Sequence, residues 1–366
     1  THIEGNIVFR DVDFTYANTG IHALKDFNFQ IKKGEKIAIL GHTGSGKTTV
    51  AQLMLRMFDV DKGQILIDGV DITIGRGQSV GLVGESGSGK STVAFTLLGL
   101  LADNAEISAN RAAFDGRETN LASGETARLR GTDIAMVFQD PMTALNPMFT
   151  IGTQLVDIQR RRFPKESRRA LWARAEAVLA DVGLQDAALR MHRYPHEFSG
   201  GMRQRVVIAM ALLVEPKLLI ADEPTTALDA TVEAQVVEML HRLRQRTVAS
   251  MLVVSHSMGL IAELCDSVIV MYAGTVVESG RVADVLHRPH HPYTRALLNC
   301  EVDPYAAFDR LQDLATIPGT VPDPAHRPQG CVFAQRCPSR HDRCVEKPPR
   351  RQAKSGQSFF CWLEAA

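Results

Sequence analysis

The sequence predicts an α/β fold built on a parallel sheet, and three observations support this prediction. Short and strongly apolar runs such as Leu218–Ala221 and Met251–Val254 are typical of buried parallel strands. Glycine-rich turns follow two of the predicted strands and lead into helices with an apolar face. Polar residues stand directly after several strands, at the carboxyl edge where open α/β sheets bind their ligands.

Length and composition set limits on the class of protein. The 366 residues suffice for two domains, or for one large domain with an appendage. Lys+Arg and Asp+Glu each total 41, so net charge does not favour a nucleic acid or an anionic lipid as partner. No apolar run approaches the ~20 residues of a membrane-spanning helix. The opening residues do not resemble a secretory signal, and the missing initial Met suggests a processed chain or an excised segment.

In chain order, the first region alternates polar and apolar residues. Ile7–Phe9, Val12–Tyr16 and Leu24–Ile31 are predicted as antiparallel strands, and Gly63–Ile72 as two short strands about a turn at Asp68-Gly69. Tyr16 either stacks on an adenine or is an ordinary aromatic residue at a strand end.

A duplicated phosphate-binding motif follows. Residues 34–50 match residues 77–93 at an offset of 43, and both copies contain the spacing G-x-x-x-x-G-K-[ST]. The N–H groups of such a turn surround a phosphate, and the next helix N-terminus adds a favourable dipole. Lys90 is expected to reach the β- and γ-phosphates and Ser91 to ligate Mg²⁺. The second copy comprises Gly84, Glu85, Ser86, Gly87, Ser88, Gly89, Lys90, Ser91 and Thr92, and the first comprises Gly41, His42, Thr43, Gly44, Ser45, Gly46, Lys47, Thr48 and Thr49.

The middle of the chain supplies two further polar sites. A strand over Asp133–Gln139 ends in Gln139, which either contacts Mg²⁺ or the attacking water, or is a solvent-facing amide. Residues 151–193 have a helical pattern. Ser199 is predicted to cap a helix whose first residues, Gly200 and Gly201, leave N–H groups open to an anion.

The strand over residues 218–222 ends in adjacent carboxylates and occurs only once in the chain. Such a pair suits a Mg²⁺-nucleotide, with Asp222 holding the water shell of the metal and Glu223 orienting an attacking water. The next buried strand delivers His256 to the same edge, where it bridges the γ-phosphate and Glu223 or is simply a core histidine. Val268–Met271 and Thr275–Val277 are predicted to form a hairpin.

Together with the signature segment Ser199–Gln204 and a turn at Leu228-Asp229, these motifs resemble those of the ATP-binding-cassette (ABC) ATPases of membrane transporters. Met202 stands in the signature where that family usually carries Gln. Residues from about 65 to 361 are similar to the importer ATPases of the oligopeptide/dipeptide permease group, on the segments 139–147, 291–298 and 317–322. The resemblance implies a P-loop NTPase fold: a RecA-like parallel sheet, an antiparallel β-subdomain, an α-helical signature subdomain and a Cys-containing C-terminal extension.

Residues 1–72 instead resemble the amino-terminal part of an ABC exporter domain, in which Tyr16 holds the adenine-stacking position. The chain therefore looks like a chimera, natural or engineered, with three parts. Residues 1–72 form an exporter-like β-subdomain with the first phosphate loop. Residues 73–285 form the importer-like core, with its helical subdomain at about 140–213. Residues 286–366 form the extension. The Gly84–Thr92 loop is expected to serve the acidic strand because it is continuous with it, although Tyr16 favours the Gly41–Thr49 loop.

Four of the six cysteines lie in the last 36 positions, in a segment rich in Pro and Arg. Clustered thiolates suit a structural metal centre, which would supply folding free energy that this segment lacks. Zinc usually has paired C-x₂₋₄-C ligands, which are absent. This wider spacing, together with the permease resemblance, implies a [4Fe–4S] cluster, with zinc or disulfides as alternatives. The four residues are Cys331, Cys337, Cys344 and Cys361.

The resemblance also implies a function. The chain would bind ATP and Mg²⁺ and energise peptide import. It would be a peripheral subunit on the cytoplasmic face of the membrane, with a permease as its direct partner and a solute-binding protein as an indirect one. ATP would lie between one chain's phosphate loop and the signature of a second ATPase subunit. Glu223 would be the base or would orient the water, His256 would be a γ-phosphate contact and Gln139 a sensor. Ser91, Gln139 and Asp222 would be the Mg²⁺ partners. The signature residues are Ser199, Gly200, Gly201 and Met202. The alternatives are an inactive or uncoupled nucleotide-binding chimera, or a non-transport ABC ATPase.

Overall fold

The computed structural model describes residues 7–16, 21–31, 72–101, 107, 112–121, 125–225, 230–246, 249–300, 316–322 and 328–363. The Gly41–Thr49 loop, the Asp68-Gly69 turn and the Leu228-Asp229 turn lie outside these residues. In the described part of the chain, no helix is long and apolar enough to span a membrane.

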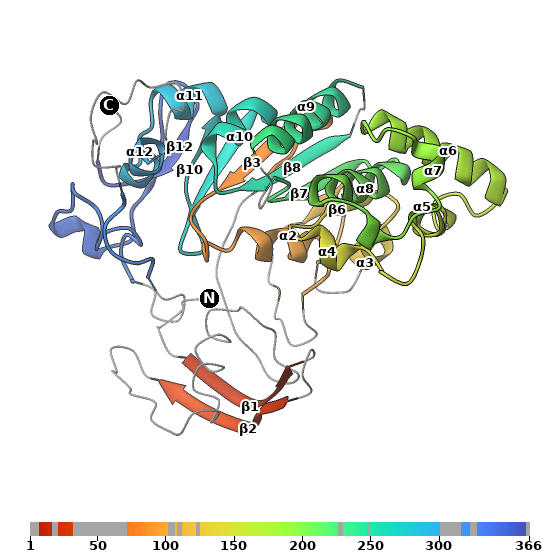
Figure 1. Ribbon diagram of the computed structural model, residues 1–366. Coiled ribbons are helices and arrows are strands. Elements are labelled where there is room, and N and C mark those ends of the chain that lie inside the picture. Colours follow the sequence, from red (N-terminus) through yellow and green to blue (C-terminus); the bar gives the residue numbers. More distant parts are fainter. Residues whose placement is uncertain are drawn as a thin grey trace, which may run out of the picture.

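A mixed sheet forms the centre of the molecule (Figure 1). Within the described residues it has eight strands in the order β11-β12-β10-β9-β3-β8-β7-β6, and the five from β9 to β6 run parallel. The strands are β3 (Ser79–Val83), β6 (Ile134–Val137), β7 (Leu218–Asp222), β8 (Ser250–Ser255), β9 (Ser267–Tyr272), β10 (Thr275–Arg281), β11 (Arg350–Gln352) and β12 (Ser358–Phe360).

Both faces of this sheet are covered, which explains why its parallel strands are apolar throughout. Side chains of β7 alternate between two cores: Leu219 joins the core beneath the helices α8, α9 and α10, and Ile220 joins the core beneath α2. Val253 and Leu252 of β8 divide in the same way. The covering helices are α2 (Lys90–Leu98), α8 (Gly200–Leu213), α9 (Ala230–Arg246) and α10 (Met258–Leu264).

A helical lobe lies beyond the β6 edge of the sheet, at the right of Figure 1. The prediction of helices over residues 151–193 is confirmed. The helices α5 and α6 each begin at a side-chain cap, Thr150 and Ser167 respectively. The lobe and its connections contain α3 (Glu125–Leu129), α4 (Pro141–Ala144), α5 (Ile151–Arg160), α6 (Arg168–Asp181), α7 (Ala187–Arg190) and the 3₁₀ turn η1 (Pro195–Glu197).

Two hairpins stand outside the main sheet. The strands β1 (Ile7–Tyr16) and β2 (Ile21–Ile31) pair antiparallel, as their alternation predicts, and Figure 1 shows them apart from the central sheet. A smaller hairpin joins β4 (Ala113–Phe114) and β5 (Arg117–Glu118).

The chain after β10 does not form a separate layer, because its strand β12 pairs with β10 and its Phe333 and Phe359 are buried. The sheet therefore continues into the region that the sequence predicts as an extension. The predicted hairpin over 268–277 is confirmed as β9–β10, with Ala273 and Gly274 at positive φ in its turn. The remaining elements are α11 (Val282–His287), α12 (Pro292–Asn299) and the 3₁₀ turn η3 (Asp342–Val345).

Candidate active site

The Gly84–Thr92 loop connects β3 to α2 at the carboxyl edge of the sheet. Gly84 lies so close to β9 that a Cβ atom there would stand 2.1 Å from the Met271 carbonyl oxygen. Gly89 caps α2 in the left-handed conformation, with φ of 92°. These two positions therefore require glycine, and the backbone wraps tightly around the start of α2.

Lys90 is the first residue of α2 and its side chain is buried. Its Nζ donates to the carbonyl oxygens of Gly84 at 2.7 Å and Glu85 at 3.1 Å, so the ammonium folds back over its own loop. Burial lowers the pKa of Lys90, and the nearby charges of Glu223 and Asp222 oppose this shift. The lysine and the acidic strand thus share one electrostatic environment.

Ser91 and Asp222 join the loop to the acidic strand. The Ser91 hydroxyl donates to Asp222 Oδ1 at 3.2 Å, across 131 residues of sequence. Asp222 ends β7 and is 2% exposed. Burial raises the pKa of Asp222, and the hydrogen bond from Ser91 and the charge of Lys90 partly offset that shift. A hydroxyl and a carboxylate placed in this way are hard oxygen ligands suited to Mg²⁺.

Glu223 follows directly, at a φ of 45°, which is unusual for a residue other than glycine. Its N–H donates to the Val254 carbonyl at 2.8 Å, so the strained backbone stays attached to β8. Its carboxylate, which is 13% exposed, accepts from Gln139 Nε2 at 3.4 Å and lies 3.2 Å from His256 Nδ1. Residues from the ends of β6, β7 and β8 therefore meet at one carboxylate.

The signature residues occupy the start of α8. Ser199 caps this helix by accepting from the Met202 N–H at 3.4 Å, as the sequence predicts. Ser199 and Gly200 are exposed, whereas Gly201 lies against Val232 of α9. Because α8 packs on α4, α5, α6 and β6, the signature is built on the helical lobe and not on the phosphate loop.

Tyr16 is the last residue of β1, and its backbone pairs with Ile21. Its side chain lies outside the part of the chain whose side chains are described. Adenine stacking by Tyr16 therefore remains a prediction.

The four cysteines of the last region lie in one neighbourhood. None forms a disulfide, and Cys331, Cys344 and Cys361 are buried. Burial raises the pKa of Cys331 to about 11, with smaller contributions from the charges of the other three thiols. Four free thiols gathered in this way are a donor set that fits a thiolate-ligated metal centre. Within the described residues, however, no three His, Cys, Asp or Glu side chains are already arranged to hold a metal ion.

Sequence reasoning missed two residues that contact the phosphate loop, Arg336 and Tyr293, and a third, Tyr272, that contacts Arg336. Glu85 of the loop forms an ion pair with Arg336, its N–H donates to the Tyr293 hydroxyl at 2.9 Å, and Arg336 also contacts Tyr272. The only sequence signal was the segment 291–298, which served to recognise the family but gave no role to Tyr293.

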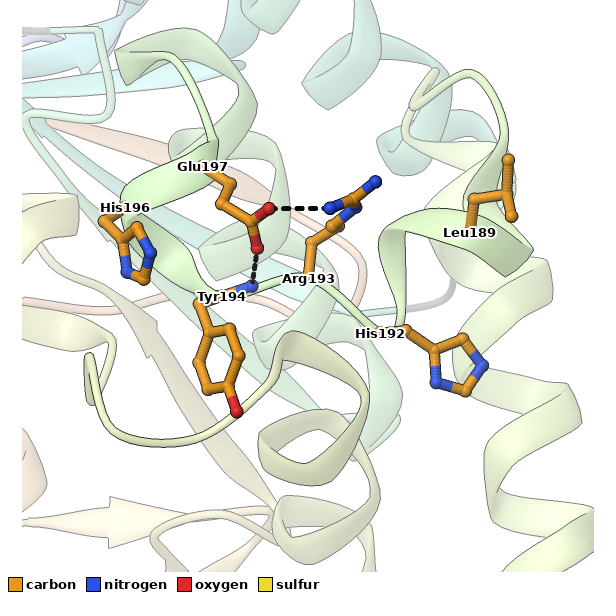
Figure 2. A pocket seen from close by; sticks show the side chains of 6 residues that line it. All are labelled: Leu189, His192, Arg193, Tyr194, His196 and Glu197. Atoms are coloured by element: carbon orange, nitrogen blue, oxygen red, sulfur yellow. Dashed lines mark hydrogen bonds and ion pairs between the residues drawn. The ribbon is translucent and has the colours of Figure 1, made fainter.

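A pocket of about 480 Å³ opens on the helical lobe, between α7 and η1 (Figure 2). Leu189 and Tyr194 are exposed there, and Glu197 accepts from Arg193 at 2.9 Å and from the Tyr194 N–H at 2.7 Å. The segment that carries Met148 and Phe149, both exposed, is joined to this region because the Ile151 N–H donates to the Arg193 carbonyl. The lining residues are Leu189, His192, Arg193, Tyr194, His196 and Glu197.

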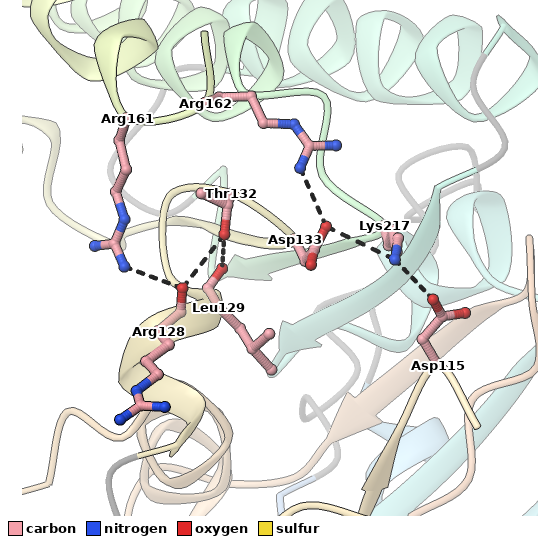
Figure 3. A network of polar contacts seen from close by, with 8 residues as sticks. All are labelled: Asp115, Arg128, Leu129, Thr132, Asp133, Arg161, Arg162 and Lys217. Carbon is pink, nitrogen blue, oxygen red and sulfur yellow. Dashed lines mark hydrogen bonds and ion pairs between the residues drawn. The ribbon is translucent and has the colours of Figure 1, made fainter. Parts of the chain in front are cut away.

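A polar network fastens the helical lobe to the amino ends of β6 and β7 (Figure 3). Asp133, just before β6, accepts from Arg162 at 3.4 Å and lies 3.8 Å from Lys217, just before β7. Lys217 also donates to Asp115 at 2.7 Å, in the β4–β5 turn. The amino ends of β6 and β7 are thereby held together, at the ends opposite to Gln139 and Glu223.

Comparisons with known proteins agree with this geometry. The family model described as ABC transporter matches residues 24–74 and residues 67–226. The first stretch contains the Gly41–Thr49 loop, and the second contains the Gly84–Thr92 loop and the acidic strand. A second model, described as the oligopeptide/dipeptide transporter C-terminal region, matches residues 277–344.

Relatives match over almost the full length. The probable D,D-dipeptide transport ATP-binding protein DdpD of Escherichia coli is 45% identical, covering 96% of this chain and 94% of its own. The dipeptide transport ATP-binding protein DppD of Bacillus subtilis is 42% identical, covering 96% and 92%. The oligopeptide transport ATP-binding protein OppD of Haemophilus influenzae is also 42% identical, covering 94% and 92%.

A dimeric structure of a bacterial ABC transporter cassette is similar in fold, with a TM-score of 0.50, 24% identity, and coverage of 75% of this chain and 98% of that one. At this identity the likeness speaks for the fold alone. Family matches, near-complete relatives and fold together lead to one conclusion: the chain belongs to the ABC transporter family, as one of its ATP-hydrolysing cassette proteins.

Proposed function

We propose that this chain is the ATP-hydrolysing subunit of an importer for oligopeptides or dipeptides. The observation that carries the proposal is the meeting of Gln139, Glu223 and His256 beside the Ser91–Asp222 contact, at the carboxyl edge of the sheet. The peptide assignment is supported by the match over residues 277–344 and by the near-complete relatives, whose names are peptide transport proteins. Steady-state ATP turnover by the purified chain tests the hydrolysis. Peptide uptake, measured in cells that lack this chain, tests the role in import.

In the proposed site, the Gly84–Thr92 loop binds the phosphates of ATP and Lys90 turns from its carbonyl partners to the β- and γ-phosphates. Ser91 would ligate Mg²⁺, and the other Mg²⁺ partners would be Gln139 and, through water, Asp222. Glu223 orients or deprotonates the attacking water, and His256 contacts the γ-phosphate. The strongest support is the 3.2 Å contact between Ser91 and Asp222, which brings this loop to the single acidic strand.

A second ATPase subunit completes the proposed site. Ser199 and Gly200 are exposed at the start of α8, and this helix packs on the helical lobe and not on the phosphate loop. A helix start of this kind suits an anion. The signature of one chain would then face the phosphate loop of another, head to tail. ATP-dependent dimer formation, followed by light scattering, tests this step.

A transmembrane permease is the proposed membrane partner, and the chain would work as a peripheral subunit on the cytoplasmic face. The apolar side chains around the helical-lobe pocket support this, because Met148 is 78% exposed and Leu189 is 67% exposed. Apolar side chains that gather into one exposed patch mark interaction surfaces. Co-purification with the permease tests the assignment. The double variant Met148→Ser, Leu189→Ser is expected to co-purify less well than the parent chain. A solute-binding protein would join only through the permease.

For the four cysteines we expect a [4Fe–4S] cluster, with zinc as the alternative. Bound there, either metal centre would cross-link a segment that has little regular secondary structure. The support is the gathering of four free thiols in one place. Iron and sulfide analysis of protein prepared without air tests the choice, and zinc alone would overturn the cluster.

Residues 1–72 are proposed to derive from a second cassette, of exporter type, with residues 73–285 as the working core and 286–366 as the C-terminal extension. The separate matches of the family model to residues 24–74 and 67–226 support a duplication. The rival outcome is a nucleotide-binding chimera that does not hydrolyse ATP, and an absence of turnover in full-length protein that binds ATP would favour it.

A further inference from the structure

Arg336 lies at the junction between the cysteine segment and the phosphate loop. Its Nη1 donates to Glu85 Oε2 at 2.7 Å and its Nη2 donates to Glu85 Oε1 at 3.2 Å. The planar guanidinium thus contacts both oxygens of one carboxylate, which is the strongest pairing available to Arg. Glu85 is the second residue of the phosphate loop, and 251 residues of sequence separate the two partners.

The other donors of Arg336 are also occupied. Its Nε donates to the Pro318 carbonyl at 2.8 Å, its Nη2 to the Ile317 carbonyl at 2.8 Å, and its Nη1 to the Tyr272 hydroxyl at 3.1 Å. The Arg336 side chain is 6% exposed. A buried fork that bonds to three separate segments leaves several acceptors without a partner if it is removed, so its geometry is well fixed.

Glu85 is held on its backbone as well. Its N–H donates to the Tyr293 hydroxyl at 2.9 Å, and the Tyr293 ring packs against Tyr272 at 4.6 Å and Phe333 at 5.3 Å between ring centroids. Burial raises the pKa of Tyr293, so its hydroxyl stays protonated and uncharged at neutral pH. Both the carboxylate and the amide of one loop residue are therefore bound by groups that lie outside the loop.

The same short turn carries these contacts and two of the cysteines. The Ala334 N–H donates to the Cys331 carbonyl at 3.1 Å, and the Arg336 N–H donates to the Phe333 carbonyl at 3.0 Å. Arg336 directly precedes Cys337. Because Arg336 lies on the turn between Cys331 and Cys337, disorder of that turn would release the guanidinium from Glu85.

We propose that Arg336 is a positioning residue for nucleotide binding, which couples the state of the four-cysteine segment to the phosphate loop. The inference rests on the proposed role of the Gly84–Thr92 loop and adds a route of control to it. With the turn ordered, Glu85 is fixed and the loop N–H groups are preorganised for phosphate. With the turn disordered, ATP binding must order the loop, and affinity falls.

The test compares Arg336→Met, which removes the fork, with Arg340→Met, an exposed arginine of the same segment, as the matched control. The readouts are the Kd for Mg-ATP from a fluorescent nucleotide titration, KM and kcat, and Tm without nucleotide. We expect Arg336→Met to weaken binding and raise KM about tenfold, because it removes hydrogen bonds between charged groups, with kcat at saturating ATP nearly unchanged. Arg340→Met should change neither Kd nor KM.

Charge-pair variants separate positioning from general stability. If the two side chains act through each other, Glu85→Gln and Arg336→Met should together weaken nucleotide binding by less than the product of their separate effects. A drop in Tm with an unchanged Kd would show that Arg336 is merely structural and would overturn the proposal. Lys90→Ala distinguishes a failure of the positioning role from a failure of the proposed nucleotide site. If Lys90→Ala also leaves the Kd for Mg-ATP unchanged, the Gly84–Thr92 loop is not the nucleotide site.

The cysteine end of the route is tested with Cys337→Ala. We expect this variant to raise the Kd for Mg-ATP severalfold in the parent chain and to have little further effect in Arg336→Met, because the contact through which it acts is then absent. Equal effects in both backgrounds would contradict a route through Arg336.

Discussion

His256 Nδ1 lies 3.2 Å from Glu223 Oε2, and this contact joins the ends of two adjacent parallel strands, β8 and β7. Gln139 Nε2 donates to the same oxygen from the next strand, β6. Glu223 has a positive φ, a strained backbone conformation for a residue other than glycine. Its carboxylate is held in place by the contacts with Gln139 and His256. In the proposed site, this carboxylate would orient the attacking water beside the γ-phosphate.

Glu223→Gln is expected to reduce ATP turnover by about 10²–10⁴-fold, the range that a general base contributes. The amide preserves shape and hydrogen bonding, so nucleotide affinity should stay within about twofold of the parent, since uniform binding is unaffected. Turnover assays and nucleotide titration measure the two effects. The matched control is Glu263→Gln, an exposed glutamate of α10. Loss of binding together with turnover would contradict the assignment.

The duplicated loops yield a second prediction. Lys90→Ala should abolish hydrolysis, because Lys90 shares its surroundings with Asp222 and Glu223, whereas Lys47→Ala should largely spare it. The same assay applied to both variants provides its own control, since each changes the equivalent lysine of one copy. The reverse pattern would assign the site to the Gly41–Thr49 loop.

Asp222 predicts a dependence of stability on pH. Its folded-state pKa is raised, chiefly by burial, so folding favours the protonated form. The contribution of Asp222 to the free energy of unfolding is therefore present below the ordinary Asp pKa of about 3.9. This contribution is lost as the pH rises through the raised pKa of the folded state. Asp222→Asn, which cannot ionise, should have a higher urea midpoint than the parent at pH 7, and the difference should shrink towards pH 4.

Asp157→Asn serves as the control for that measurement, since its side chain is 62% exposed and its ion pair with Arg160 lies on the surface. If Asp222→Asn instead lowers the midpoint at pH 7, the hydrogen bond to Ser91 outweighs the burial of the charge. Turnover should be lost in Asp222→Asn at every pH.

Alanine substitutions at the two signature glycines, Gly200 and Gly201, distinguish a role in helix packing from a role in the ATP-dependent dimer. A Cβ at Gly201 would stand 2.5 Å from Val232 Cγ1, whereas a Cβ at Gly200 would meet nothing within 4 Å. Gly201→Ala should therefore destabilise the chain by about 1–3 kcal/mol, the usual cost of overpacking. Gly200→Ala should leave stability nearly unchanged and weaken the ATP-dependent dimer. Urea unfolding and light scattering give the two readouts, and equal stability losses would show that α8 and α9 are packed differently.

Local patterns were enough to predict the strands that hold the site. The apolar runs at β7 and β8, the turn at Ala273-Gly274 and the Ser199 cap are each specified within a few residues. The ordering of polar side chains at the strand ends then follows from parallel topology. The meeting of Gln139, Glu223 and His256 could therefore be anticipated from sequence, and the assignment of their chemical roles remains a prediction.

Long-range pairings in the last region could not be predicted in this way. The strand β11 consists of Arg350–Gln352 and has no apolar alternation, and β12 spans only Ser358–Phe360. Their place in the sheet depends on β10 and not on their own composition. The contact between Arg336 and Glu85 likewise depends on how the final turn packs, because an arginine in a segment rich in arginines carries no distinctive local signal.

The pairing of β12 with β10 has a consequence for the handling of this protein. Without residues 350–360, β10 would become the outermost strand and present unpaired N–H and C=O groups along Glu278 and Ser279, which now face Phe359 and Ser358. Bare strands of this kind recruit other chains. The β11–β12 hairpin thus protects this edge of the sheet. Truncated versions of the protein that lack the hairpin are expected to aggregate during expression, even when their nucleotide site is intact.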